Sequence, residues 1–141
     1  MRRVVLDTSV IVAGLRSRSG ASQALLRLVG ERIVTPLAAP ALFLEYEEVL
    51  KRPEQRIATG LSIEQLDLFL AALSDATEPV ELHYRWRPQV RDPADEMVLE
   101  VAINGRADAL VTHNVLDFAD VASRFGIPLL RPGEVLKRIG T

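Results

Sequence analysis

The sequence contains no cysteine. Disulfide frameworks, zinc sites with thiolate ligands and cysteine nucleophiles are therefore excluded. The chain also has no apolar stretch near the roughly 20 residues that a membrane helix needs, so we expect a soluble, cytoplasmic protein with no membrane partner. The start, MRRVVLDTSVIVAGL, has two arginines and an apolar run. Asp7 interrupts that run and no small-residue cleavage site follows, so we interpret the segment as a buried strand entering a helix.

The chain has no excess of positive charge. Its net charge of −2 argues against nucleic-acid binding that depends on the overall charge of the protein. Fifteen of the seventeen basic residues are nevertheless arginine, the side chain suited to forked phosphate contacts. A basic rim around an acidic centre is therefore compatible with this composition.

The composition is otherwise that of an ordinary globular protein, with 48% apolar and 26% charged residues among 141. This length is sufficient to bury a core without disulfides or a structural metal. We expect a single domain over residues 1–141.

Short apolar runs alternate with amphipathic segments, which predicts strands alternating with helices. The predicted strands are Arg3–Leu6, Arg32–Thr35, Thr77–Arg87, Ala109–Thr112 and Ile127–Leu130. The predicted helices are Ala21–Val29 with Ser22 as a possible start, the segment opened by Pro40, Ser62–Leu73 with a capping box of Ser62 and Gln65, Pro93–Gly105, and a terminal helix opened by Pro132. This order predicts an α/β fold with a mainly parallel five-stranded sheet covered on both faces.

Four acidic residues fall at one edge of this predicted sheet. Asp7 follows the first strand, and Asp117 follows the fourth strand by a few residues. Asp95 lies in the first turn of the helix before the fourth strand, and Glu45 lies early in the helix after the second. In such sheets, ligands bind beyond the carboxyl ends of the strands. The four carboxylates are therefore predicted to converge there.

Carboxylates raise one another's pKa unless a cation compensates their charge, so a converging group predicts a metal. Oxygen ligands favour Mg²⁺ or Mn²⁺, which can activate water and neutralise charge on a phosphodiester. Each acid also has a structural interpretation. Asp7 could cap the next helix, Asp92 and Asp95 could serve a helix dipole, Glu45 could be solvated, and Asp117 could cap a turn. Only the joint placement of the acids favours a site.

Four segments carry the most information: VVLDTSVIVAGL, PALFLEYEEVLKRP, RDPADEMVLEVAINGRADALVTHNVLDF and FGIPLLRPGEVL. In order and spacing, these segments resemble those of the PIN-domain nucleases, and especially the VapC-like toxins of type II toxin–antitoxin modules. The resemblance spans nearly the whole chain. It implies an α/β/α sandwich, an acidic pocket for Mg²⁺ or Mn²⁺, and endoribonuclease activity on single-stranded RNA. It also implies a homodimer and a small antitoxin whose segment occupies the acidic groove.

Motif by motif, the resemblance assigns Asp7, Glu45, Asp95 and Asp117 as the first to fourth acids of the family, in catalytic and metal-binding roles. Glu48 is a weaker rival to Glu45. Asp92 is a possible outer-shell acid.

Three positions depart from the family pattern. Ser9 stands where asparagine is common, and its hydroxyl can still hydrogen-bond a carboxylate or a metal-bound water. Asn114 stands where the family often has an acid, so the fourth carboxylate is assigned to Asp117 and the Asn114 amide to positioning water or phosphate. Glu96 replaces a frequent asparagine. These departures motivate an alternative function, a non-catalytic PIN-like module that binds RNA or protein.

The segment HYRWRPQVR interleaves arginines with Tyr84 and Trp86, a combination that RNA binding would use. We favour inward packing of both aromatic residues, with solvated arginines. If this interpretation is wrong, Arg87→Ala should weaken RNA binding in a salt-dependent way. His113 adjoins the predicted pocket, and we interpret it as a loop histidine.

Overall fold

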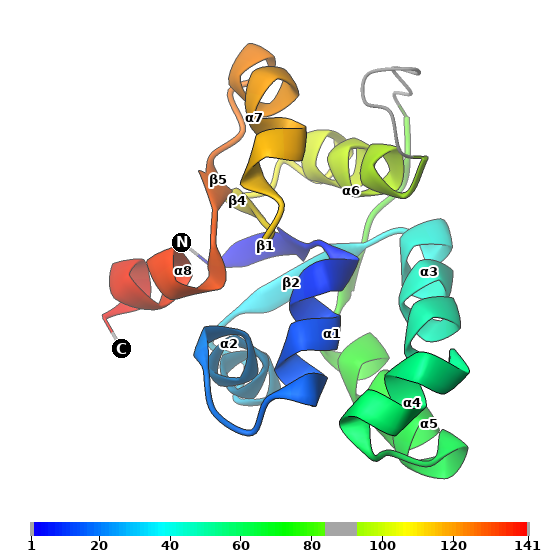
Figure 1. Cartoon of the computed structure of the whole chain (residues 1–141). Helices are drawn as coiled ribbons and strands as arrows, with labels where there is room; N and C mark the ends of the chain where they lie inside the picture. The colour runs from blue at the N-terminus through cyan, green and yellow to red at the C-terminus, as the bar shows by residue number, and fades with distance from the viewer. Residues whose placement is uncertain (1, 84–92, 141) are drawn as a thin grey trace.

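The computed structural model describes residues 2–83 and 93–140, within which helices and strands alternate (Figure 1). The strands are β1 (Arg3–Leu6), β2 (Thr35–Ala38), β3 (Glu78–Pro79), β4 (Ala109–Val111) and β5 (Leu129–Leu130). The helices are α1 (Thr8–Arg16), α2 (Ala21–Gly30), α3 (Pro40–Leu50), α4 (Pro53–Thr59), α5 (Ile63–Ala76), α6 (Pro93–Asn104), α7 (Val115–Arg124) and α8 (Pro132–Ile139).

The five strands form one sheet in the order β3-β2-β1-β4-β5, and every pairing is parallel. Parallel crossovers are right-handed, so the reversal of direction after β3 places the helices that follow on the opposite face. Helix α6 packs across β1, β2 and β4, whereas α2 packs against α1, α5 and α8 (Figure 1). The predicted α/β/α sandwich is confirmed, and the sheet is wholly parallel.

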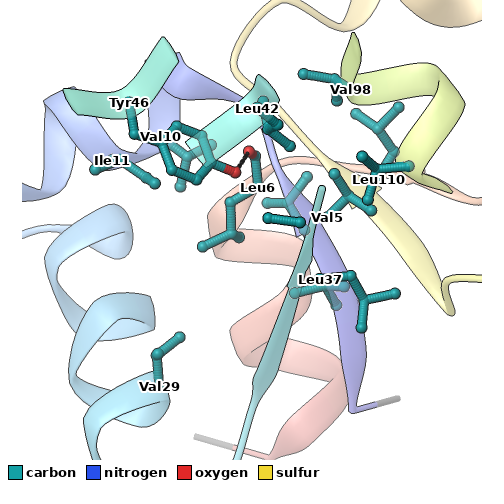
Figure 2. Close-up of a cluster of buried hydrophobic side chains, with 14 of the residues drawn as sticks. Val5, Leu6, Val10, Ile11, Val29, Leu37, Leu42, Tyr46, Val98 and Leu110 are labelled. Carbon is teal, nitrogen blue, oxygen red and sulfur yellow. Dashed lines mark hydrogen bonds between the residues drawn. The ribbon is translucent and has the colours of Figure 1, made fainter. Parts of the chain in front are cut away.

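The core surrounds β1, the central strand. Val4, Val5 and Leu6 are fully buried, because a strand of this kind has helices over both of its faces. Figure 2 shows the apolar side chains of α1, α3 and α6 packed around β1 and its neighbours. The centre of the sheet therefore gives a rigid support for whatever follows the carboxyl ends of β1 and β4.

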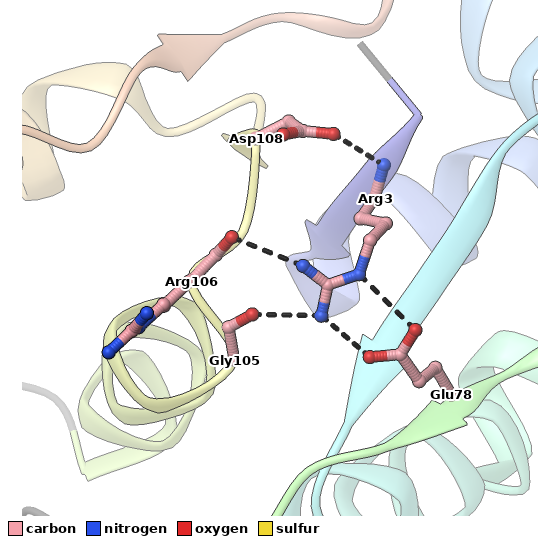
Figure 3. Close-up of polar contacts among 5 residues, drawn as sticks. All are labelled: Arg3, Glu78, Gly105, Arg106 and Asp108. Atoms are coloured by element: carbon pink, nitrogen blue, oxygen red, sulfur yellow. Dashed lines mark hydrogen bonds and ion pairs between the residues drawn. The ribbon is translucent and has the colours of Figure 1, made fainter.

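An ionic cluster closes the opposite end of β1 (Figure 3). The Arg3 guanidinium donates from Nη2 to Glu78 Oε2 at 2.6 Å and from Nε to Glu78 Oε1 at 3.2 Å, and it also donates to the carbonyls of Gly105 and Arg106. The hydrogen bonds between Arg3 and Glu78 raise the pKa of Arg3 and lower that of Glu78. The Asp108 carboxylate accepts the backbone N–H groups of Arg2 and Arg3, which lowers its pKa. The cluster joins β1, β3 and the approach to β4.

The predicted second strand was wrong by three residues. Arg32 has a φ of 64°, and the N–H groups of Ile33 and Val34 bond back to the carbonyl of Leu28. These residues therefore end α2, and β2 begins only at Thr35.

Pro36, the residue directly after the predicted second strand, lies within β2. The N–H of Thr35 bonds across to Arg2, so Pro36, one residue on, faces β3. The pairing with β3 starts only at Leu37, so the missing N–H of Pro36 removes no ladder bond.

The third strand is also shorter than the predicted Thr77–Arg87. Its ladder ends at Pro79, although Val80 is still buried and Glu81 exposed as the alternation predicts. The remainder of the predicted strand, from Tyr84, lies outside the described residues. The fifth strand is likewise reduced to Leu129–Leu130.

The other differences concern helices. Helix α2 is preceded by Gly20, so Ser22 does not start it. Helices α4 and α7 were not predicted, whereas the Ser62–Gln65 capping box of α5 is confirmed. Among the helices of the described ranges, none alone is long and apolar enough to cross a membrane. The bent pair of α4 and α5 would together meet the length and composition that a membrane span needs, and no more than that supports it.

Candidate active site

Asp7 occupies the point where β1 ends and α1 begins. It is the N-cap residue of α1, but its side chain makes no capping hydrogen bond. Its carboxylate instead accepts the hydroxyl of Ser9 at 2.9 Å and the hydroxyl of Thr112 at 2.6 Å, and the residue is only 6% exposed. A buried carboxylate needs such partners because desolvation disfavours its charge. The structure therefore does not support the alternative that Asp7 merely caps a helix.

This position is the reversal point of the strand order. β1 and β4 are neighbours in the sheet, and the N–H of Asp7 donates to the Val111 carbonyl at 2.9 Å. Thr112 follows β4 directly, and its Oγ1 accepts the N–H of Asn114 at 2.9 Å. Asp7, Thr112 and Asn114 thus form one hydrogen-bonded chain across the two strand ends. Ligands bind at such reversal points in open α/β sheets.

The two hydroxyl groups that hold Asp7 bond the same oxygen, Oδ2. No hydrogen bond among the described residues ends on Oδ1. A carboxylate fixed through one oxygen, with its other oxygen available, fits a ligand for a hard cation, and the two hydroxyls would fix its orientation. The oxygen donors around Asp7 are therefore of the kind that a divalent cation takes.

Helix α3 contributes Tyr46 to this site. Tyr46 is buried, and its hydroxyl donates to the carbonyl of Leu6 (Figure 2). Burial, with the nearby negative charge of Asp7, raises the pKa of Tyr46. Its phenol therefore stays a protonated donor. Glu45, the preceding residue, is half-buried, whereas its rival Glu48 is exposed and bonds Arg52 at 3.1 Å.

Helix α6 brings further acids toward the same edge. Val98 and Ala102 belong to the core, so the stripe that contains them faces the sheet, and the half-buried Asp95 lies one turn before Val98 on that stripe. Glu96 and Glu100 are 3% and 1% exposed. Glu96 was expected only as a departure from the family pattern, and Glu100 was not among the predicted site residues. Their four-residue spacing places them on one face of the helix, but a solvated face would have the same spacing, so nothing in the sequence indicated their burial.

Asp117 is exposed in the first turn of α7, and its backbone N–H donates to the carbonyl of Asn114 at 3.1 Å. Asn114 is the residue before that helix, and its own N–H links it to Thr112. Asp92 lies outside the described residues. Within residues 2–83 and 93–140, no three His, Asp or Glu side chains are grouped to hold one metal ion. The backbone of Asn114 is therefore one hydrogen bond from Thr112, and the backbone of Asp117 is one further hydrogen bond along the same chain.

His113 lies at the rim of the same network. Its Nε2 is 2.8 Å from the Ser22 hydroxyl of α2, and its backbone N–H donates to Ser9 Oγ at 3.4 Å. The loop histidine expected from sequence is therefore held against both α1 and α2.

The fold and the site define a doubly wound α/β domain with a fixed carboxylate at its reversal point. The family model of the PIN domain matches residues 3–116. The chain belongs to the PIN-domain family, whose members are generally nucleases that act on nucleic acid. The matched range includes Asp7, Glu45, Asp95 and Asn114 and stops one residue before Asp117. A comparison with curated proteins found no match.

Proposed function

We propose that the protein is a Mg²⁺- or Mn²⁺-dependent endoribonuclease that cleaves phosphodiester bonds in single-stranded RNA. The observation that carries this proposal is the buried Asp7 carboxylate, held through Oδ2 by two hydroxyl groups at the reversal point of a PIN-domain sheet. A carboxylate with one fixed and one available oxygen is suited to holding a cation against a substrate phosphate.

In this proposal Asp7, Glu45 and Asp95 hold the metal, which when bound would activate water and neutralise charge on the phosphodiester. Ser9 and Thr112 keep the Asp7 carboxylate in one orientation through their hydroxyl bonds. The fourth position, assigned from sequence to Asp117, is shared in our proposal with Asn114. The backbone N–H of Asn114 bonds to Thr112, and the side-chain amide of Asn114 would position water or phosphate.

The direct test is cleavage of an end-labelled single-stranded RNA by the purified chain, with Mn²⁺, with Mg²⁺ and with EDTA. Cleavage that depends on metal and spares single-stranded DNA of the same sequence is the expected result. Absence of cleavage, together with no heat of Mn²⁺ binding and no thermal stabilisation by either metal, would favour the non-catalytic module. The absence of a three-carboxylate group among the described residues is the observation that keeps this alternative in view.

We further propose that the nuclease acts in the cytoplasm as a homodimeric toxin, inhibited by a small antitoxin that offers an arginine to the carboxylates. Induced expression in a bacterial host should stop growth, and Asp7→Asn should remove the effect at equal protein level. A small reading frame overlapping the upstream end of the gene would support the pairing. Growth arrest that persists with Asp7→Asn would contradict a toxin role based on cleavage.

A further inference from the structure

The peptide group between Leu6 and Asp7 is held at both of its polar atoms. Its N–H belongs to Asp7 and donates to the Val111 carbonyl on β4. Its carbonyl belongs to Leu6 and accepts the Tyr46 hydroxyl from α3. Because both bonds are buried, the plane of this peptide is fixed. That plane sets the direction in which the Asp7 side chain leaves the backbone.

The Tyr46 hydroxyl bonds a strand carbonyl that has no partner in the sheet. Alternate residues of a parallel strand bond to opposite neighbours, and the Arg2 carbonyl bonds to Thr35, so the Leu6 carbonyl faces the β2 side. The pairing of β1 with β2 extends only to Val4. The Tyr46 hydroxyl therefore takes the place of a strand partner beyond the point where the two strands separate.

The same contact fixes α3. The Tyr46 ring is buried and meets the Phe43 ring edge-on, with 5.9 Å between centroids. Glu45, the preceding residue on this turn, moves with it. The Tyr46–Leu6 bond thus couples the backbone that carries Asp7 to the helical turn that carries Glu45.

We infer that Tyr46 is a positioning residue, which holds the carboxylates of Asp7 and Glu45 in the relative placement that a shared cation requires. This inference rests on the proposed function. It assigns to the Tyr46 hydroxyl a role separate from that of its ring, which fills space in the core. Groups that hydrogen-bond a ligand side chain directly typically change metal affinity by about 10–100-fold. Tyr46 acts one step further away, through the backbone of Leu6, so the lower end of that range is expected.

Tyr46→Phe removes the hydroxyl and keeps the ring. The matched control is Thr77→Val, which removes a hydroxyl that donates to the Leu73 carbonyl at 2.6 Å at the end of α5. Four quantities are measured for each protein: the melting temperature without metal, the Mn²⁺ dissociation constant by calorimetry, and kcat and KM for a single-stranded RNA in Mn²⁺. Tyr46→Phe should raise the Mn²⁺ dissociation constant about tenfold and lower kcat at limiting Mn²⁺, with KM for RNA unchanged.

Thr77→Val should lower the melting temperature and leave the metal and kinetic constants at wild-type values. If Tyr46→Phe changes only the melting temperature, as the control does, the inference is overturned and the proposed nuclease stands. If the wild-type protein neither binds Mn²⁺ nor cleaves RNA, the proposed function fails and the inference fails with it. The wild-type measurements therefore separate the two failures.

Discussion

Replacing Thr112 tests how Asp7 is held. The Thr112 hydroxyl is fully buried, donates to Asp7 Oδ2 at 2.6 Å and accepts the N–H of Asn114 at 2.9 Å. Thr112→Val keeps the size and branching of the side chain but removes both hydrogen bonds. Thr112→Ser keeps the hydroxyl and removes only a methyl group, so it is the matched control.

The expected magnitudes follow from these contacts. A hydrogen bond to a charged group contributes about 1.5–3 kcal/mol and a neutral one about 1 kcal/mol. Thr112→Val should therefore destabilise the fold by about 3 kcal/mol, allowing for the apolar area that valine adds. Thr112→Ser should cost about 1 kcal/mol, the value of one buried methyl group with its small cavity.

Urea unfolding followed by circular dichroism measures both changes. With a slope of about 1.5 kcal/mol per molar urea, Thr112→Val should lower the midpoint by about 2 M and Thr112→Ser by less than about 1 M. Thr112→Val should also weaken Mn²⁺ binding by at least about tenfold, whereas Thr112→Ser should not. If the two variants unfold at the same midpoint, the Thr112 hydroxyl does not stabilise Asp7 and our description of the site is wrong.

Two further predictions concern the scaffold. Gly14→Ala should destabilise the fold by about 1–2 kcal/mol, because a Cβ there would lie 3.0 Å from Leu26 Cγ and 3.2 Å from the Ser22 carbonyl oxygen. Gly30→Ala should be neutral or slightly stabilising, because nothing lies within 4 Å of a Cβ at that position. Calorimetric melting of the two variants measures the difference. Arg3 lowers the pKa of Glu78 below its ordinary 4.5, so this pair stabilises the fold above that pH and the stabilisation is lost as the pH falls through the lowered pKa. Because Glu78 is 43% exposed, Glu78→Gln should remove only about 0.5–1 kcal/mol at pH 7 and nothing near pH 2, as urea midpoints at the two pH values will show.

Opposite signs for the two alanine substitutions would show that contact, and not helix propensity, decides the outcome; equal effects would contradict the close packing of α1 on α2. A Glu78→Gln penalty that is as large near pH 2 as at pH 7 would contradict the ionic origin of that contribution.

Local signals in the sequence were sufficient for most of the fold. The apolar run of β1 and the prolines that open α3, α6 and α8 mark elements whose cause lies within a few residues. The shift of β2 could not be read locally. It arises because the N–H groups of Ile33 and Val34 bond to the Leu28 carbonyl at the end of α2, although both residues are good strand formers.

The candidate site was predicted in part, for a comparable reason. Asp7 follows a buried strand, and that position alone brings it to the ligand-binding edge. The bond from Tyr46 to Leu6 joins residues forty positions apart, and no periodicity in the sequence predicts it. Glu96 and Glu100 have the same spacing that a solvated helix face would have, so their burial became visible only in the fold.

The central claim is that the Asp7 carboxylate makes this chain a metal-dependent nuclease. Its most direct test is the single-turnover rate at which Asp7→Asn cleaves a single-stranded RNA in Mn²⁺. The control is Asp75→Asn. Asp75 is an exposed residue of α5, and its carboxylate pairs with Arg32. We predict that Asp7→Asn cleaves at least about 100-fold more slowly than the wild type, because loss of one charge-stabilising group typically has an effect of this size. Asp75→Asn should cleave at the wild-type rate. Full metal-dependent cleavage by folded Asp7→Asn would contradict the account.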